Sequence, residues 1–187
     1  MIKRGDILVK LQLSNKGDDE VQYLMSIHYS HPKGFVGRQI IYKIYNDDEF
    51  KGVITGGSAT LHLPNRNEFF GNKFNLQYII NNNFFHLIDD HNDKNLGTKV
   101  LSLWRRQIVK DWVNRYGGEV IGFETLVELP RSGSIYKADN WTLVGQTKGF
   151  TCRRVAGTEK GVFSGGKRIW NTNEDELKPK LVFCKSI

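Results

Sequence analysis

The stretch that decides the fold is residues 94–116, which read KNLGTKVLSLWRRQIVKDWVNRY. Its apolar residues recur at intervals of three and four, the spacing of one face of an α-helix. They are Leu96, Val100, Leu103, Trp104, Ile108 and Trp112. Asp93 or Asn95 can cap the start, and Gly117-Gly118 can end it. The sequence therefore predicts one long amphipathic helix from about residue 95 to residue 116.

Strands are predicted on both sides of this helix. Residues 78–88 form one strand, and the polar run Asn81-Asn82-Asn83 inside it favours a bulge or a kink that faces a site. Residues 119–127 form the next strand. A short helical turn over 134–140 and a strand over 142–145 follow, and Leu181-Val182-Phe183 closes the chain as a last strand.

The N-terminal part is predicted to be β-structure. Apolar residues alternate with others over residues 7–13, and 15–19 follow as a turn. Residues 35–45 and 51–63 are rich in aromatic and β-branched residues and flank an acidic turn, so we expect a hairpin. The predicted class is α+β, with a mixed, mostly antiparallel central sheet flanked by helices and a basic C-terminal arm.

Length and charge narrow the function classes. At 187 residues and 39% apolar content, the chain can bury one core, so we expect a single domain, residues 1–187. A net charge of +7 favours a polyanionic partner, above all nucleic acid. No stretch approaches the roughly 20 apolar residues of a membrane span, and the N-terminus is charged, so we expect a cytoplasmic protein. Cys152 and Cys184 have no zinc-site spacing and are expected to be reduced thiols.

The start of the long helix is a candidate phosphate site. A helix N-terminus after a strand offers unpaired backbone N–H groups and a partial positive charge. Gly97 would let a pyrophosphate approach the backbone, and Lys94 and Lys99 could neutralise it. The predicted cofactor-binding residues are Lys94, Asn95, Leu96, Gly97, Thr98 and Lys99. The alternative is an ordinary solvated helix start with incidental lysines.

Residues 132–141, SGSIYKADNW, carry a second candidate site. They resemble the end of a GNAT-type N-acyltransferase domain, in which a tyrosine on a short last helix lies near the cofactor thiol. Tyr136 stands at that position, and a phenol of high pKa can protonate a departing thiolate. Trp141 fills the aromatic position of the pattern, and Asn140 replaces its usual glycine. The alternative is a packed tyrosine whose hydroxyl is simply hydrogen-bonded.

A third candidate set combines His28-Tyr29-Ser30-His31 with Glu124 and Glu128. Imidazole, phenol and carboxylate could bind a divalent metal or activate an exocyclic amine. Strand alternation puts Glu124 and Glu128 on the same face, so geometry does not choose between them. The alternative is that the two histidines are surface residues of a loop.

In order along residues 23–187, these motifs resemble the phage Mom proteins and the DruA-like domain of Druantia defence systems. The most specific piece is the run 133–141 followed by Gly145-Gln146-Thr147-Lys148. The resemblance implies a GNAT-like fold and an acyl-CoA-derived donor, with acetyl-CoA expected. It further implies transfer of a carbamoylmethyl-like group to the exocyclic amine of adenine in double-stranded DNA, which would protect phage DNA from restriction.

The resemblance also implies a reactive site. It maps to His28, Tyr29, Glu128 and Tyr136, with Glu124 competing for the acidic position, where Mom proteins tend to have aspartate. His28 and Glu128 would hold a metal such as iron or zinc.

For DNA, we expect phosphate contacts from basic residues and stacking of an extruded base on Trp141 or Trp170. The basic residues are Lys137, Arg153, Arg154, Lys160, Lys167 and Arg168. The alternative for this basic segment is a solubilising tail.

Two other functions compete with base modification, and the chain could also form a homodimer. The first is a DNA-binding module that performs no chemistry. The second is a nuclease, which would need a carboxylate cluster with a lysine partner. The sequence around residues 119–128 has the carboxylates without a convincing lysine.

Overall fold

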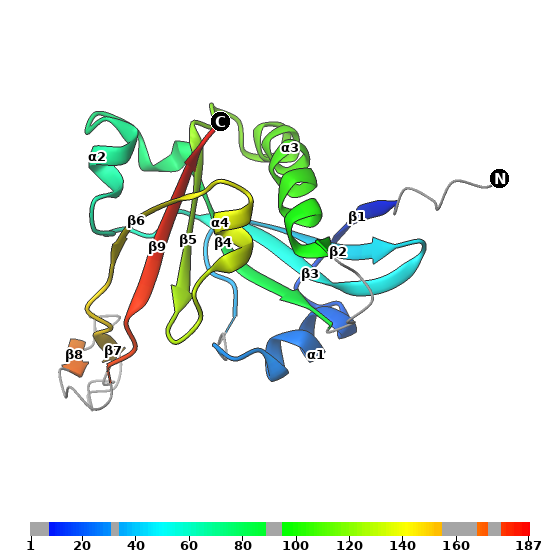
Figure 1. Cartoon of the computed structure of the whole chain (residues 1–187), viewed down its shortest axis with the longest axis horizontal. Coiled ribbons are helices and arrows are strands. Elements are labelled where there is room, and N and C mark those ends of the chain that lie inside the picture. The colour runs from blue at the N-terminus through cyan, green and yellow to red at the C-terminus, as the bar shows by residue number, and fades with distance from the viewer. Residues whose placement is uncertain (1–7, 31–33, 89–94, 155–167, 172–176) are drawn as a thin grey trace, which may run out of the picture.

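The computed structural model describes residues 8–30, 34–88, 95–154, 168–171 and 177–187. Its main feature is a seven-stranded sheet in the order β1-β2-β3-β4-β5-β9-β6. The strands in that order are β1 (Val9–Ser14), β2 (Gln39–Asn46), β3 (Glu49–Ser58), β4 (Ile79–Leu87), β5 (Gly122–Glu128), β9 (Lys180–Ser186) and β6 (Thr142–Gln146). Only β4 and β5 pair in parallel, and every other pair in this sheet is antiparallel. The predicted mixed, mostly antiparallel sheet is confirmed (Figure 1).

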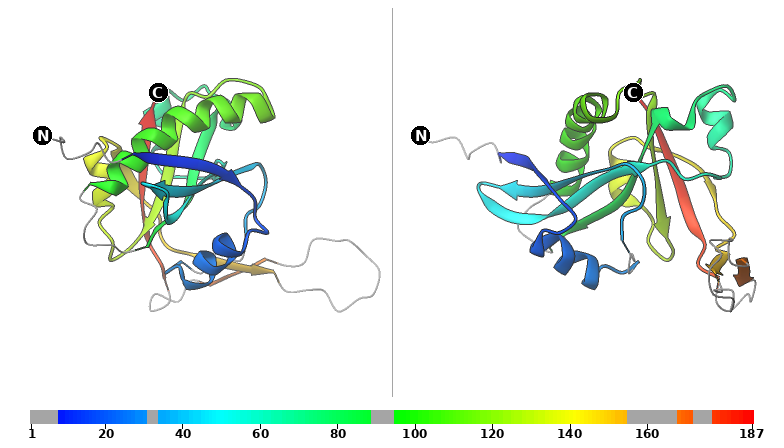
Figure 2. Two further views of the ribbon diagram at one scale, coloured as in Figure 1. Left: turned by 90° about the vertical axis from the view of Figure 1, so that its right-hand side faces the viewer. Right: turned by 180° about the vertical axis from the view of Figure 1, so that it is seen from behind.

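Helices cover both faces of the sheet (Figures 1 and 2). The long helix α3 (Leu96–Tyr116) matches its prediction and ends at Gly117, as expected. The other helical elements are α1 (Asp19–Ile27), α2 (Arg66–Phe70), the single 3₁₀ turn η1 (Leu76–Tyr78) and α4 (Ser134–Ala138). None of the described helices is long and apolar enough to cross a membrane.

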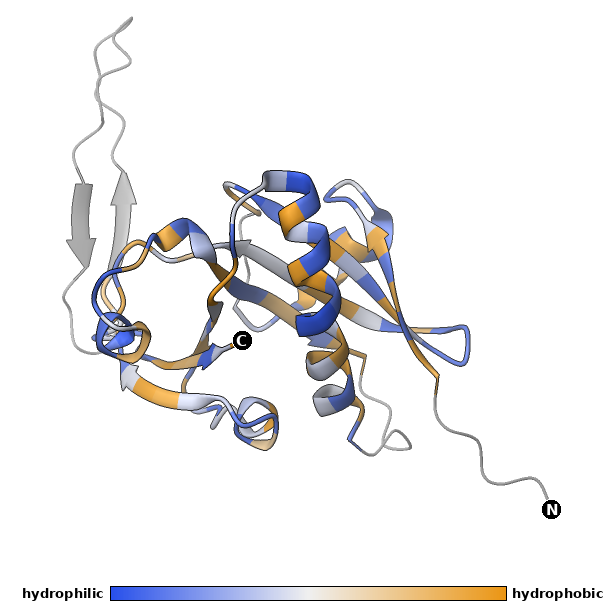
Figure 3. Cartoon of the chain, turned by 90° about the horizontal axis from the view of Figure 1, so that it is seen from above, coloured by the Kyte–Doolittle hydropathy of each residue, from blue (hydrophilic) through white to orange (hydrophobic). Residues whose placement is uncertain are grey.

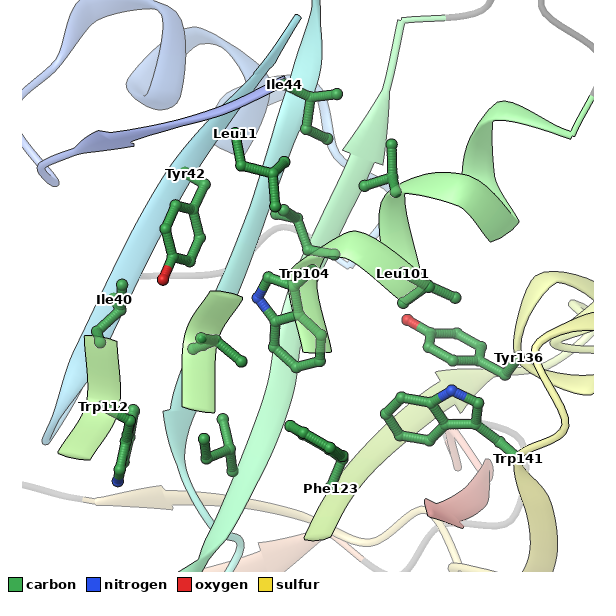
Figure 4. Packing of buried hydrophobic residues seen from close by; sticks show 14 of the residues in the cluster. Leu11, Ile40, Tyr42, Ile44, Leu101, Trp104, Trp112, Phe123, Tyr136 and Trp141 are labelled. Atoms are coloured by element: carbon green, nitrogen blue, oxygen red, sulfur yellow. The ribbon is translucent and has the colours of Figure 1, made fainter. Parts of the chain in front are cut away.

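The main core lies between α3 and the sheet. Trp104, Ile108 and Trp112 are fully buried there against residues such as Ile40 and Phe123 (Figure 4). Apolar and polar residues alternate along α3, as expected of a helix with one buried face (Figure 3). The three- and four-residue spacing read from the sequence is therefore the core-facing side of this helix.

A second, smaller core lies under α1 on the opposite face. Val21, Leu24 and Met25 of α1 pack against Val53 and Phe84, among others. This helix was missing from the prediction, although Asp18 caps it by accepting a hydrogen bond from the Glu20 N–H at 3.2 Å. Its nine residues are too few for a stable isolated helix, so tertiary packing stabilises it. Helix α2 was also missing from the prediction.

The basic C-terminal arm contains two strands that the sequence did not predict. Its described parts are strands β7 (Thr151–Arg154) and β8 (Arg168–Asn171), which pair as a separate two-stranded antiparallel sheet. The arm therefore begins and ends as paired backbone. Residues 155–167 between these strands lie outside the described part of the chain.

A β-bulge in β4 and a split beside it organise the site. Thr55 pairs with Phe84 and Gly57 with Asn81, so two steps along β3 match three along β4, and the predicted bulge is confirmed. Parallel pairing of β4 with β5 covers only residues 79–81 and 122–124. Beyond these residues the two strands separate, which opens the sheet next to the bulge.

Candidate functional site

A cavity of about 620 Å³ lies where β4 and β5 separate. Its walls are residues 28–30 after α1, 81–85 of β4, 125–127 of β5, 131–136 at and before α4, and Lys180. Three residues that the sequence singled out from distant positions, His28, Tyr29 and Tyr136, thus line one space. Residues 28–30 follow α1 on one face of the sheet and Tyr136 belongs to the core on the other face, so this cavity is walled from both sides of the sheet.

Tyr136 forms the wall on the α3 side. Its hydroxyl donates a hydrogen bond to Asn82 Oδ1 at 2.7 Å, and its ring packs on Phe183 and Trp141 at centroid distances of 5.9 and 5.2 Å. Burial raises the pKa of Tyr136 well above its usual range. The side chain is therefore a neutral phenol that can supply a proton at the split. Gly133, in the left-handed region at φ 67°, begins the turn that places it.

The bulge residue Asn82 is held on three sides. Its Nδ2 donates to the Thr55 carbonyl at 2.8 Å, its Oδ1 accepts from Tyr136, and its main-chain carbonyl accepts from Thr125 Oγ1 at 2.9 Å. The bulge also changes which residues face each side. In a regular strand, residues five positions apart point to opposite faces. Because of the bulge, Ile80 and Phe85 both pack in the α3-side core, whereas Phe84 faces α1.

His28 and Tyr29, directly after α1, form the wall on the other side. The His28 ring lies 4.2 Å from that of Tyr29 and 4.6 Å from that of Phe84, and its Nδ1 lies 2.8 Å from Ser30 Oγ. The Arg131 guanidinium stacks on the outer part of this wall, 3.4 Å from the centroid of the Tyr29 ring. Burial raises the pKa of Tyr29, and Arg131 opposes that shift.

The structure separates the two candidate carboxylates. Glu124 is fully buried outside the cavity lining, where it forms a 3.0 Å ion pair with Arg66 and accepts the Thr60 N–H. Burial raises the pKa of Glu124, against the opposing effect of Arg66. Glu128 lies farther along β5, 3.4 Å from the ammonium of Lys180, a lining residue. Glu124 therefore stabilises the paired end of β4 and β5, and Glu128 is the carboxylate beside the cavity.

The predicted metal site at His28 and Glu128 gains no support from the structure. Within the described ranges, no group of three or more histidine, cysteine, aspartate or glutamate side chains could hold a metal ion. The His28 side chain is engaged with Ser30 and with aromatic rings, and Glu128 is paired with Lys180. The described residues therefore do not form a ligand set for iron or zinc, and His31 of the same candidate set lies outside them.

A second cavity, of about 780 Å³, lies at the N-terminus of α3. Four predicted cofactor residues line it, namely Asn95, Leu96, Gly97 and Thr98. Asn95 takes the N-cap position in a left-handed conformation, and its side chain makes no capping hydrogen bond. The N-cap side chain therefore leaves the first-turn N–H groups of α3 unpaired, and Asp93, the other predicted cap, lies outside the described residues. Lys99 lines a neighbouring cavity of about 680 Å³, and Lys94 lies outside the described residues.

The two cavities are neighbours. They share Arg131, Ser134 and Ile135 as lining residues, and together they extend from Tyr136 to the start of α3. Sequence reasoning missed Arg131 as a site residue. The available signal was its place directly before the SGSIYKADNW run.

The predicted DNA contacts have different outcomes. Lys137 is exposed. The stacking role of Trp141 has to be corrected, because this side chain is only 4% exposed and its Nε1 donates to Asp139 at 2.8 Å. Arg153 and Arg154 belong to β7, and Arg168 and Trp170 to β8. Lys160 and Lys167 lie outside the described residues.

Several solved structures share this architecture. An acetyltransferase from Bacillus subtilis in complex with CoA matches with a TM-score of 0.58 at 10% identity, over 96% of this chain and 99% of that chain. A GNAT family acetyltransferase from Elizabethkingia anophelis with acetyl-CoA bound matches with a TM-score of 0.56 at 8% identity, over 96% and 98%. RimL, a ribosomal L7/L12 alpha-N-protein acetyltransferase, matches with a TM-score of 0.55 at 11% identity, over 96% and 93%. At these identities the likeness shows the fold, which is the GNAT fold predicted from the sequence.

Sequence comparison identifies the family. A search of curated proteins found no match. Residues 4–156 match the family model described as Druantia protein DruA, which is more than half of the chain. The chain therefore belongs to the DruA family.

Proposed function

We propose that this protein transfers an acyl group from an acyl-CoA thioester, with acetyl-CoA as the expected donor, to an amine held at the split between β4 and β5. One observation carries the proposal. The buried Tyr136 hydroxyl lies in a cavity that shares three lining residues with a second cavity at the N-terminus of α3. A thioester-bearing chain with a pyrophosphate at its far end would extend over these two neighbouring cavities.

The residues at the start of α3 fit such a donor. First-turn N–H groups and the positive end of a 21-residue helix favour a phosphate. A Cβ on Gly97 would lie 3.1 Å from Ile135 Cγ2, so glycine keeps this part of the cavity wide. Ser134 and Thr98 add polar side chains along the same cavity. When bound, the donor supplies the acyl group and a thiol leaving group.

The chain's own side chains can move the protons that the reaction requires. Transfer forms a C–N bond and breaks a C–S bond, so the sulfur gains a proton and the amine loses one. Tyr136, held neutral by burial, supplies the proton to the sulfur from the α3 side. His28 and Ser30 line the same cavity from the α1 side, and His28 Nδ1 lies 2.8 Å from Ser30 Oγ, so the imidazole can take the proton of the attacking amine through the Ser30 hydroxyl.

The acceptor in this proposal is the exocyclic amine of adenine in double-stranded DNA, and the product is an N-acylated adenine, N-acetyladenine when acetyl-CoA is the donor, which would block restriction. The net charge of +7 supports a polyanionic substrate. Arg131 and Lys180 at the cavity, and exposed Lys137 on α4, supply positive charge close to the chemistry.

Mass spectrometry of nucleosides tests the chemistry. Plasmid DNA from cells that express the wild-type protein is expected to contain a heavier deoxyadenosine, and DNA from cells that express Tyr136→Phe is expected to lack it. Unmodified DNA in both samples, with folded protein present, would refute base modification.

Donor binding is tested separately by thermal unfolding with and without acetyl-CoA. A ligand at about 100 times its Kd stabilises the folded state by about 2.7 kcal/mol. DNA binding without this stabilisation would instead favour a DNA-binding module.

The DNA contacts have their own test. Neutralising Arg153 and Arg154 is expected to weaken DNA binding and to lower its salt dependence, by about 0.9 in log–log slope for each phosphate that is no longer neutralised. An unchanged slope would remove these two residues from the interface.

A further inference from the structure

The α1-side half of the cavity at the split has a chemistry of its own. Tyr136 lines the cavity on the α3 side. The lining on the α1 side includes His28, Tyr29, Phe84 and Asn83. Three of these four side chains are aromatic rings within 4.6 Å, centroid to centroid, of a neighbour in the group. Such a wall favours a flat, unsaturated ligand.

The Arg131–Tyr29 contact shows that a planar group fits over the Tyr29 ring. The guanidinium carbon lies 3.4 Å from the ring centroid, the separation of two stacked planes. Tyr29 is half-buried against His28, and Arg131 is exposed at its outer side. Tyrosine rings and arginine guanidinium planes are both surfaces on which nucleobases stack. A base can stack on Tyr29 in the place that the guanidinium now occupies if the exposed Arg131 side chain moves outward and covers the other face of the base.

Asn83 provides a directed hydrogen-bond donor in the same half. Its Oδ1 accepts from Thr55 Oγ1 at 2.6 Å and from Gln39 Nε2 at 3.0 Å, so both lone pairs are engaged. Its Nδ2 donates once, to Gln39 Oε1 at 3.2 Å, and its second N–H has no partner among the described residues. Asn83 is exposed and lines the cavity. This amide therefore offers one N–H to an acceptor atom of a ligand.

We propose that this half of the cavity binds the acceptor as a planar, amino-bearing nucleobase, stacked between Tyr29 and Arg131, with a ring nitrogen accepting the free N–H of Asn83. The inference rests on the proposed acyl transfer and assigns the residues that hold its acceptor. An aliphatic amine has no π-face for Tyr29. When charged, it has no lone pair for Asn83, and it would be repelled by Arg131.

Fluorescence of 2-aminopurine, an adenine isomer whose emission reports stacking, tests the binding without any donor. The probes are a single-stranded DNA oligonucleotide with one 2-aminopurine, the same strand with an abasic site there, and the free 2-aminopurine nucleotide. The readout is the ratio of the Kd for the abasic strand to the Kd for the base-containing strand, because phosphate contacts cancel in that ratio. Wild type is expected to prefer the base by about 5- to 150-fold and to change its emission.

Three variants locate the base. Tyr29→Leu is expected to bring the ratio close to one and to remove the emission change, and Arg131→Ala to lower both in part. Asn83→Asp, of the same shape, replaces the N–H with an acceptor and is expected to reduce the ratio. The control is Lys110→Ala, which removes one exposed charge on α3 and should weaken both strands equally. Circular dichroism checks that each variant is folded.

A ratio near one in wild type, absence of binding, or equal ratios in wild type and Tyr29→Leu would each overturn the inference. Binding of the free nucleotide alone would move the proposal from DNA to small nucleotides. Donor-dependent acylation of a peptide amine with an unchanged rate in Tyr29→Leu would leave acyl transfer standing and refute the base site. Base stacking without any transfer would refute the proposed chemistry and leave the base site standing.

Discussion

Replacing Tyr136 with phenylalanine removes one oxygen atom and keeps the ring that packs on Phe183 and Trp141. The lost hydroxyl is the donor to Asn82 Oδ1, in a buried hydrogen bond of 2.7 Å. Asn82 is 3% exposed, so water cannot easily replace the donor. An acceptor left without a partner in such a place costs about 1–3 kcal/mol of unfolding free energy.

Activity is expected to fall by much more than stability. Loss of a general acid typically slows a reaction by about 10²- to 10⁴-fold. Burial raises the pKa of Tyr136 in the folded protein. The neutral hydroxyl therefore contributes its full share of the unfolding free energy below about pH 10, the usual tyrosine pKa, and this share is lost as the pH rises above that value. In a neutral-pH assay the hydroxyl is therefore always protonated, and the variant reports the loss of the proton donor itself.

The assay combines urea unfolding with release of the CoA thiol, measured by a chromogenic disulfide. Tyr23→Phe is the matched control, since Tyr23 is 63% exposed on α1, and it should stay within about 0.5 kcal/mol of wild type. Full thiol release by folded Tyr136→Phe protein would refute the general-acid role. A stability change below about 0.5 kcal/mol would refute the buried hydrogen bond.

Three other changes test the phosphate site, the α4 turn and the acid sensitivity of the α1 side. Thr98→Glu places a carboxylate beside the first-turn amides of α3 and is expected to weaken CoA binding about tenfold in a calorimetric titration, whereas Asn114→Glu on the last turn should not. Gly133→Ala is expected to cost more than about 2 kcal/mol in urea unfolding, because a left-handed residue alone costs about 1–2 kcal/mol and its Cβ would also meet an aromatic ring at 2.5 Å. Gly71 is also left-handed, but an added Cβ there would have no atom within 4 Å, so Gly71→Ala should cost only the backbone penalty of about 1–2 kcal/mol. Burial lowers the pKa of His86, so the stability from its neutral ring is present above about pH 6.5 and is lost as the pH falls through the lowered value. Thermal melts should show a smaller acid-side loss for His86→Phe, and identical pH profiles would contradict the burial of this ring.

Local patterns predicted the parts of the fold that depend on neighbouring residues. Helix α3 followed from the spacing of its apolar residues, and its end followed from Gly117. The bulge in β4 followed from three consecutive asparagines, because polar residues in a buried strand need partners that a regular ladder does not supply. Tyr136 was identified from the motif around it, and the structure places it at the cavity.

Tertiary structure decided what depends on distant contacts. Glu124 and Glu128 are four positions apart on β5, so alternation could not choose between them. The point at which β4 and β5 separate buries the first with Arg66 and leaves the second beside the cavity. The indole ring of Trp141 is suited to stacking on a base, but it packs against Phe123 in the core.

The site itself is assembled by the same long-range contacts. The last strand, β9, enters the sheet between β5 and β6, a placement that no local pattern encodes. Residues 28 and 136 meet at one cavity although more than 100 positions separate them, because α1 and α4 pack on opposite faces of a sheet that opens between its parallel strands. The sequence by itself determined helix α3, the strands of the main sheet and the chemistry of the candidate side chains, but not α1 or α2. Burial of two cores, one on each face, decided which of those residues share a site, since the hydrophobic effect acts on the whole chain and not on its local segments.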